Sequence, residues 1–235
     1  MILSGASSFI VTGYEFAKKA LESSVDNEFY SNLTKSNIKY FIQKIKKEDK
    51  LDSPPRQELI VIENFYEDPD KVRNHALSLE YPVQGNYPGK RTKPILYDKI
   101  KEKFESIIGR PIKYWPEDLY NGSFQIVTED GKSWIHRDAT EWSAVVFLTP
   151  NPPKDGGTKM YIHKPTQKSY ADTKEIEEQM NKSTYKEEDW ELLDRIGNQY
   201  NRCILFRGKR SHISDRYFGK DLNDGRLFQT FFFND

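Results

Sequence analysis

The sequence has a single cysteine, Cys203, and no surplus of charge of either sign. One cysteine excludes a disulfide framework and a zinc site built on several cysteine ligands. Lysine and arginine total 36, aspartate and glutamate also total 36, and the formal net charge is therefore zero. Nucleic acids and anionic membrane surfaces are bound through basic patches, which this balance does not favour. We expect no partner of either kind.

Long apolar runs are also missing. No stretch approaches the roughly 20 apolar residues that span a membrane. Residues 1–19 have neither the charged start nor the sustained apolar centre of a signal peptide. These absences predict a cytoplasmic protein. Aromatic residues, in contrast, make up 14% of the 235 positions. Disordered chains are poor in them, so we expect a folded core that is largely aromatic.

The first 57 residues differ in character from the rest. Residues 13–24 and 28–47 have the composition and spacing of helices. The charged segment that follows contains a double proline at 54–55, which cannot continue a helix and therefore indicates a linker. The sequence predicts an N-terminal helical extension and linker over residues 1–57 and a second domain over residues 58–235.

The second domain has the pattern of a mainly β (α+β) fold. Helices are predicted over 69–80, after the start signal Asp68-Pro69, and over 95–108, before Gly109. A charged stretch at about 167–200 is predicted to be a helical insertion, either a solvated face or a lid. Short apolar runs bounded by turn residues predict strands at 59–62, 123–128, 143–149, 158–163, 202–206 and 226–233. This pattern of short strands and turns is typical of a sandwich, a barrel or a jelly roll.

Two of the four histidines lie beside predicted strands and have suitable neighbours. Residues i and i+2 of an extended segment point the same way, so His136 and Asp138 are expected to face one point while Arg137 faces away. His212 follows the strand 202–206 after a short turn. If the fold brings these strands together, the result is a two-histidine, one-carboxylate set, which binds Fe(II) and leaves coordination positions open.

Arg226 starts the last predicted strand, 14 residues after His212, and shares a strand face with Phe228 and Thr230. A guanidinium near a metal can hold a carboxylate through two parallel hydrogen bonds. A metal site with an anchored carboxylate suits 2-oxoglutarate, because the keto-acid end chelates iron and the distal carboxylate reaches the arginine.

The order HRD, SH and R on short strands resembles the Fe(II)/2-oxoglutarate-dependent oxygenases. The run SFQIVTEDGKSWIHRDATEWSAVVFLTPNPPKDGGTKMYI, with a Gly-Gly turn after the HxD, is similar to the prolyl-4-hydroxylase-like branch. NFYEDPDKVRNHAL and YPGKRT resemble uncharacterised oxygenase-like proteins of bacteria and tailed phages. The resemblance covers about residues 58–235 and implies a double-stranded β-helix, or jelly roll, with packing helices.

The resemblance also implies a role for each matching residue. His136, Asp138 and His212 would be the iron ligands and the catalytic centre. Arg226 would bind the distal carboxylate of 2-oxoglutarate, and O₂ would be the second cosubstrate. The implied activity is that of a dioxygenase, a hydroxylase that releases succinate and CO₂. Halogenases of this superfamily have a small residue where this chain has Asp138, so hydroxylation is favoured over chlorination.

Three features depart from the family pattern. The branch usually has a cosubstrate-contacting tyrosine three positions before its turn glycine, and here that position is Thr128. Either Thr128 or the nearby Tyr120 would take the role. Arg226 follows the distal histidine by more positions than is usual. The two histidines, His136 and His212, are also unusually far apart, which the insertion explains.

Tyr87, Arg91, Trp134 and His163 are candidates for the substrate pocket. The likeness to prolyl hydroxylases makes a peptide or protein side chain one substrate class, and a small molecule is the other. Two alternatives stay open. A cupin-like metalloenzyme that does not use 2-oxoglutarate would need His163 as a third histidine ligand. A non-enzymatic β-sandwich binding module would bind no metal.

Overall fold

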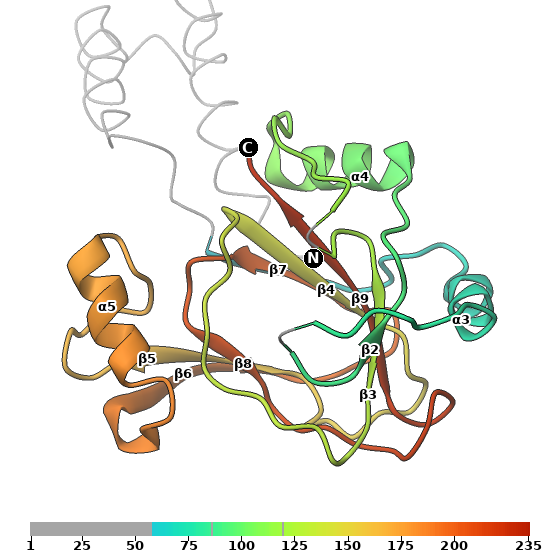
Figure 1. The fold of residues 1–235 in the computed structure, drawn as a ribbon. Helices are drawn as coiled ribbons and strands as arrows, with labels where there is room; N and C mark the ends of the chain where they lie inside the picture. Colours follow the sequence, from blue (N-terminus) through green and yellow to red (C-terminus); the bar gives the residue numbers. More distant parts are fainter. Residues whose placement is uncertain (1–57, 86, 119) are drawn as a thin grey trace, which may run out of the picture. The chain divides into compact units, whose positions relative to one another are not determined.

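A computed structural model describes residues 58–85, 87–118 and 120–235 (Figure 1). The helices expected at 13–24 and 28–47, and the linker after them, lie outside the described residues. Residues Gln57–Asp235 form one compact unit. Within the described ranges, no helix is long and apolar enough to cross a membrane.

The described chain alternates short strands with a few helices. In order, these are β1 (Leu59–Ile62), α3 (Pro69–Leu77), β2 (Lys90–Arg91), α4 (Asp98–Ile108), β3 (Phe124–Val127), β4 (Trp142–Phe147), β5 (Thr158–His163), α5 (Lys174–Lys182), the 3-10 helix η1 (Glu187–Asp189), β6 (Trp190–Ile196), β7 (Cys203–Arg207), β8 (His212–Ser214) and β9 (Arg226–Phe233).

The strands form two antiparallel sheets, as their short lengths and turn-rich connections led us to expect (Figure 1). The larger sheet has the order β1-β7-β4-β9-β3-β2, and the smaller sheet has the order β6-β5-β8. Neighbours in the larger sheet are far apart in sequence: β4 pairs with both β7 and β9. This crossing of the chain brings residues 142–147 beside the C-terminal strand.

The helix start and stop signals are confirmed, with small shifts. The Asp68 side chain accepts a hydrogen bond from the Lys71 N–H at 2.9 Å, and α3 begins at Pro69. It ends at Leu77, before the predicted end at 80. Helix α4 begins at Asp98 and ends at Ile108, and the next residue, Gly109, has a left-handed φ of 69°. Glycine adopts this conformation without strain, which fixes the end of the helix.

The prediction that 167–200 is a helical insertion is wrong for its second half. Helix α5 accounts for Lys174–Lys182, but Trp190–Ile196 form strand β6, which pairs with β5. Strand β6 lies at the edge of the smaller sheet and buries only its two end residues, Trp190 and Ile196. Its charged middle hides the alternation that signals a strand.

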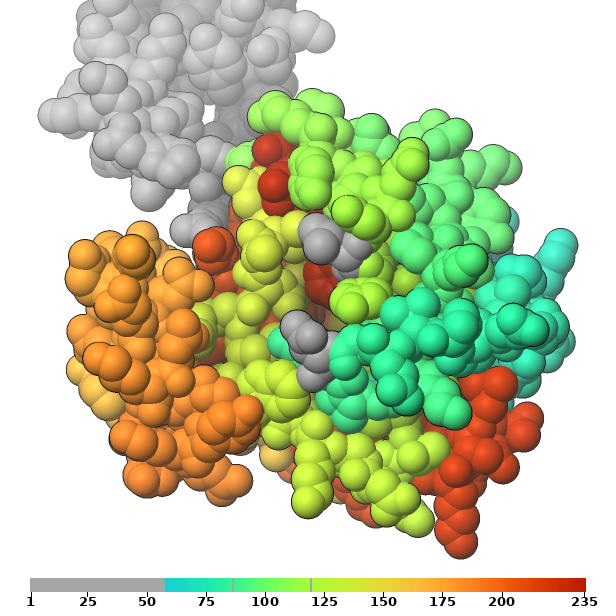
Figure 2. Space-filling view, in the orientation of Figure 1, coloured from blue at the N-terminus to red at the C-terminus, as the bar shows by residue number. Residues whose placement is uncertain are grey.

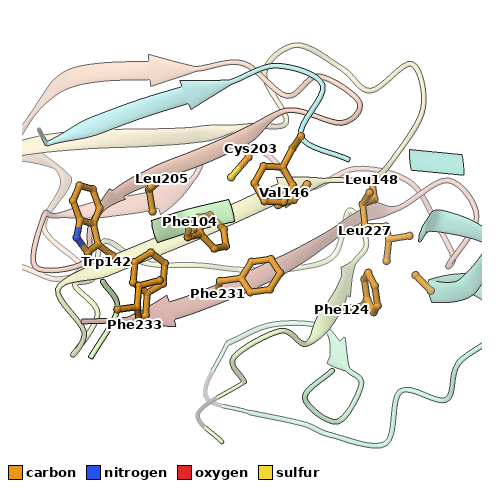
Figure 3. Packing of buried hydrophobic residues seen from close by; sticks show 14 of the residues in the cluster. Phe104, Phe124, Trp142, Val146, Leu148, Cys203, Leu205, Leu227, Phe231 and Phe233 are labelled. Atoms are coloured by element: carbon orange, nitrogen blue, oxygen red, sulfur yellow. The ribbon is translucent and has the colours of Figure 1, made fainter. Parts of the chain in front are cut away.

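The two faces of the larger sheet have different partners. Side chains alternate along each strand, so every second residue faces α3 and α4 and the others face the smaller sheet. Phe104 of α4 lies 5.2 Å, centroid to centroid, from both Phe231 and Phe233 of β9 (Figure 3). The buried core on this helix side includes Ala76, Phe104, Ile108, Phe124, Trp142, Ala144, Val146, Leu148, Cys203, Leu205, Leu227, Phe231 and Phe233. It is rich in aromatic rings, as the composition predicts.

The opposite face of the larger sheet packs partly against the smaller sheet. Its buried cluster consists of Val127, Phe147, Ile204, Phe206 and Phe228, together with Met160 and Ile196 from β5 and β6. Polar side chains replace apolar ones on this same face at Gln125, Ser143, Arg226 and Thr230, all of them buried. A polar interior between two sheets indicates a binding site rather than a core.

Candidate active site

The backbone brings His136 and His212 together. The two residues form an isolated antiparallel bridge, in which each N–H donates to the other's carbonyl at 2.9 Å. The Asp138 N–H donates to the Gly208 carbonyl at 2.7 Å. As a result, one nitrogen or oxygen atom from each of His136, Asp138 and His212 lies within 4.8 Å of the others. The juxtaposition expected from the HxD spacing and the distal histidine is present.

Both imidazoles are held in one tautomer. His136 Nδ1 lies 2.9 Å from the Trp134 carbonyl, and His212 Nδ1 lies 2.7 Å from the Arg210 carbonyl. A carbonyl can only accept, so each Nδ1 carries the proton and each Nε2 keeps its lone pair. Burial, and then the neighbouring His212, lower the pKa of His136 to about 3. His136 is therefore neutral at physiological pH, as a metal ligand must be.

The carboxylate is oriented by two further residues. The Ser143 hydroxyl of β4 donates to Asp138 Oδ2 at 2.6 Å. Gly208 lies against the same group: a Cβ there would come within 2.3 Å of the Thr140 carbonyl and 2.9 Å of Ser143 Oγ. Only glycine fits this approach, which keeps Asp138 and Ser143 in place.

The donor set fits a divalent metal. His136 Nε2 lies 3.9 Å from Asp138 Oδ1, and His212 Nε2 lies 3.5 Å from Asp138 Oδ2. Bonds of about 2.1 Å to such ligands place neighbouring donor atoms about 3 to 3.5 Å apart. A small contraction would therefore close the set around an ion. Two imidazoles and one carboxylate match the facial arrangement of non-haem iron sites.

The three residues lie at a cavity of about 220 Å³ between the sheets. Figure 2 shows this face hollowed between the green and yellow-green segments, with red atoms of the C-terminal part visible at depth. The lining includes the expected Tyr87, Arg91, Tyr120, His136, Asp138, His212 and Arg226, and also Gln125, Ser143, Tyr217, Phe228 and Thr230. Apart from the histidines, its charged residues are Arg91, Arg226 and Asp138.

Arg226 is a buried charge in this lining, with 1% of its surface exposed. Its Nε and Nη2 donate to the carbonyls of Gly156 and Gly157 at 2.8 and 3.1 Å. Its Nη1 is buried and has no hydrogen-bond partner among the described residues. Burial lowers the pKa of Arg226 to about 10, which leaves it charged at neutral pH. A buried guanidinium with a free N–H fits an anion that enters the cavity.

The Gly-Gly turn explains how Arg226 is held. A Cβ at Gly156 would lie 2.5 Å from the Phe218 ring, and one at Gly157 would lie 1.9 Å from the Ile196 carbonyl. Side chains are therefore excluded at both positions. The two carbonyls fix one edge of the guanidinium and leave Nη1 uncommitted.

Of the two residues considered for the cosubstrate contact, the structure brings Tyr120 to the cavity and not Thr128. Thr128 lines a separate hollow, to which Tyr87 also contributes. It follows Val127, which faces the interior, so alternation turns Thr128 outward. Tyr217, which sequence reasoning missed, lines the cavity and lies 5.9 Å from the Arg226 guanidinium, ring centroid to Cζ. The long loop before Arg226 was its only sequence signal.

Of the four candidates for the substrate pocket, two line the cavity and two do not. Tyr87 and Arg91 line the cavity, and the Tyr87 ring lies 4.4 Å from that of His136. Trp134 does not line it: its ring stacks on Tyr87 at 5.1 Å, and its carbonyl holds His136. Trp134 thus packs against Tyr87 outside the lining of the cavity.

His163 lies away from the cavity, and the structure does not support it as a substrate contact. It is 1% exposed, with Nδ1 3.0 Å from Thr166 Oγ1 and Nε2 3.0 Å from Ser183 Oγ. Both ring nitrogens are thus occupied. Among the described residues, the candidate metal-binding group contains two histidines and not three. The cupin-like alternative needed His163 as a ligand, and this arrangement does not provide it.

Two solved structures illustrate what this chain is similar to. HygX from Streptomyces hygroscopicus, solved with nickel and 2-oxoglutarate bound, is 13% identical, aligns over 84% of this chain and 85% of its own, and has a TM-score of 0.50. A prolyl hydroxylase from Trichoplax adhaerens, solved with a hypoxia inducible factor peptide fragment, is 14% identical over 83% of this chain and 92% of its own, with a TM-score of 0.44. The likeness to HygX confirms the jelly-roll fold that the sequence predicted.

No curated protein sequence matches the chain. A family profile described as a family of unknown function, DUF6445, matches residues 50–233. This match includes β1 to β9 and every residue of the candidate site. It extends over most of the sequence, and the protein therefore belongs to the DUF6445 family.

Proposed function

We propose that this protein is an Fe(II)- and 2-oxoglutarate-dependent dioxygenase that hydroxylates an unactivated C–H bond and releases succinate and CO₂. The observation that carries the proposal is one cavity that contains both a His-Asp-His donor set and a buried guanidinium with a free N–H. A metal-binding module would need the first feature only. The second fits a cosubstrate that chelates the metal with one end and presents a carboxylate at the other.

Each residue has a defined task in this proposal. His136 and His212 would bind Fe(II) through Nε2, and Asp138 would bind it through one carboxylate oxygen. Arg226 would receive the distal carboxylate of 2-oxoglutarate, and Tyr120 and Tyr217 would line its path. The bound iron, 2-oxoglutarate and O₂ supply the oxidising chemistry. The protein would orient the three ligands, anchor the cosubstrate and hold the reacting C–H in the cavity beside them.

The proposed substrate is a peptide or protein side chain or a small molecule. The cavity is small, so only the reacting group of a larger substrate would enter it beside the cosubstrate. Nucleic acid is not proposed as a substrate, because the chain has no net positive charge. The proposal places the protein in the cytoplasm, where its single buried thiol, Cys203, would stay reduced.

The test is an anaerobic titration of the full chain with Fe(II) and then 2-oxoglutarate. A weak visible charge-transfer band should appear when both are present. His212→Ala should abolish the band, because a ligand is lost, and Arg226→Ala should require much more 2-oxoglutarate to reach it. His75→Ala, a change at an exposed histidine on α3, is the matched control and should behave as wild type.

The other outcomes separate the alternatives. Metal binding without the band would indicate a metalloenzyme that does not use 2-oxoglutarate. No metal binding by the wild-type protein would indicate a non-enzymatic binding module with this fold. Either result would overturn the proposal.

A further inference from the structure

The cavity contains a second buried guanidinium, which the proposed function does not use. Arg91 lies on β2 and is 3% exposed. Its Nε donates to Gln125 Oε1 at 3.0 Å, and its Cζ lies 4.7 Å from the centroid of the Tyr120 ring. Its Nη1 is buried without a hydrogen-bond partner, and no carboxylate among the described residues forms an ion pair with it. Arg91 and Arg226 are therefore both buried guanidiniums with an Nη1 that has no hydrogen-bond partner among the described residues.

The two arginines lie in different parts of the cavity lining. Arg226 starts β9, in the interior of the larger sheet, and is fixed by the Gly-Gly turn. Arg91 lies two strands away, on the edge strand β2. Its Cζ is 5.9 Å from the centroid of Tyr87, whose ring lies 4.4 Å from that of His136. An anion on Arg91 would therefore lie beside Tyr87, close to the metal ligands.

The charge of the loaded cavity points to such an anion. Among the described residues of the lining, Asp138 is the one carboxylate, against two guanidiniums. Fe(II) adds two positive charges, and 2-oxoglutarate adds two negative ones. One positive charge stays unbalanced in a buried space, where an unpaired charge is costly. One further carboxylate would neutralise it.

Glycine again makes room for the arginine. A Cβ at Gly85 would come within 2.6 Å of Arg91 Nη1 and 2.8 Å of the Tyr120 hydroxyl. With Gln125 on one edge and the Tyr120 ring on one side, the guanidinium is held in place before any ligand arrives. A preorganised planar fork is suited to the two oxygens of a carboxylate.

We infer that Arg91 binds a carboxylate of the primary substrate and thereby sets which C–H faces the metal. This inference rests on the proposed function, and it narrows the substrate to an acid: a small carboxylic acid or an acidic side chain. Arg91 is thus a binding residue for the substrate and not for 2-oxoglutarate.

The test uses the full chain loaded with Ni(II), which does not turn over, and saturated with 2-oxoglutarate. Thermal unfolding is measured with acetate, propionate, butyrate and valerate, and with the primary amide of each. The acids should raise the melting temperature and the amides should not, because only the acids pair with Arg91. Short acidic peptides and their amide counterparts, tested next, distinguish a peptide source of the carboxylate from a small-molecule source.

Three variants assign the effect to Arg91. Arg91→Gln should weaken acid binding at least about tenfold while it changes 2-oxoglutarate affinity less than about threefold. Arg91→Lys keeps the charge and should keep a weaker preference for acid over amide. Lys93→Gln removes an exposed charge close by on the chain and should match wild type.

The inference fails if acids and amides stabilise the protein equally, or if no acid stabilises it while 2-oxoglutarate does. It also fails if Arg91→Gln loses 2-oxoglutarate affinity as strongly as Arg226→Gln, because Arg91 would then belong to the cosubstrate site. Failure of the proposed function looks different: 2-oxoglutarate itself would not stabilise the Ni(II)-loaded wild-type protein.

Discussion

Replacement of Arg226 by methionine should separate ligand binding from stability. The side chain lies against three aromatic rings: its Cζ is 4.3 Å from the centroid of Phe228, 5.2 Å from that of Phe147 and 5.9 Å from that of Tyr217. Methionine is of similar length, is flexible and packs well against aromatic rings. The variant removes the charge while it fills most of the space.

The stability terms oppose each other. The loss of two hydrogen bonds from a charged donor to the carbonyls of Gly156 and Gly157 costs about 3 to 6 kcal/mol. Removal of a buried guanidinium that forms no ion pair with the described residues stabilises the folded protein by several kcal/mol. The free energy of unfolding should therefore change by no more than about 2 kcal/mol in either direction. The affinity for 2-oxoglutarate should fall by about 2 to 3 kcal/mol, or roughly 30- to 150-fold.

Two measurements check this. Urea unfolding of the protein without metal or 2-oxoglutarate gives the stability change. Calorimetric titration of the Ni(II)-loaded protein gives the 2-oxoglutarate affinity. Arg110→Met, which removes a half-exposed charge paired with Asp235, is the control. A loss of more than about 3 kcal/mol of stability with unchanged 2-oxoglutarate affinity would mean that Arg226 is a structural residue and not an anchor for the cosubstrate.

Three further outcomes follow from the site. Ser143→Ala removes the donor to Asp138 and should weaken metal binding about 10- to 100-fold by calorimetry; equal affinity would show that the contact is dispensable. Gly208→Ala forces a Cβ to 2.3 Å from the Thr140 carbonyl and should reduce metal affinity, with Gly197→Ala, where the nearest atom is 3.2 Å away, as control. His163→Leu removes the ring contacts to Thr166 Oγ1 and Ser183 Oγ and should lower the melting temperature without a change in metal affinity; a lost metal site would restore His163 as a ligand.

The sequence predicted the parts of the site that depend on local geometry. His136 and Asp138 converge because two residues along an extended segment share a face, and that rule needs no knowledge of the fold. Arg226 was found because it starts a strand. Strand β6 was missed because its middle is exposed and charged, so the apolar alternation that marks a strand is absent.

Other parts of the candidate site depend on which strands become neighbours in the sheet. Ser143 can reach Asp138 only because β4 lies between β7 and β9, and no spacing in the sequence encodes that order. Thr128 was expected from its position before a turn glycine, but the direction of its side chain is set by the strand that precedes it. The free Nη1 atoms of Arg91 and Arg226 likewise become visible only when their partners are known.

Strand β9 carries the helix-side core on one face and the cavity on the other. Leu227, Phe231 and Phe233 belong to the first, and Phe228 and Thr230 to the second. Evolution can therefore vary the even positions to change what the cavity accepts while the odd positions keep the protein folded. In a library of single variants, substitutions along this strand would alternate residue by residue in their effect. Those at odd positions would lower stability, and those at even positions would change what the cavity binds. Members of the family could in this way diverge in chemistry without first acquiring a new scaffold.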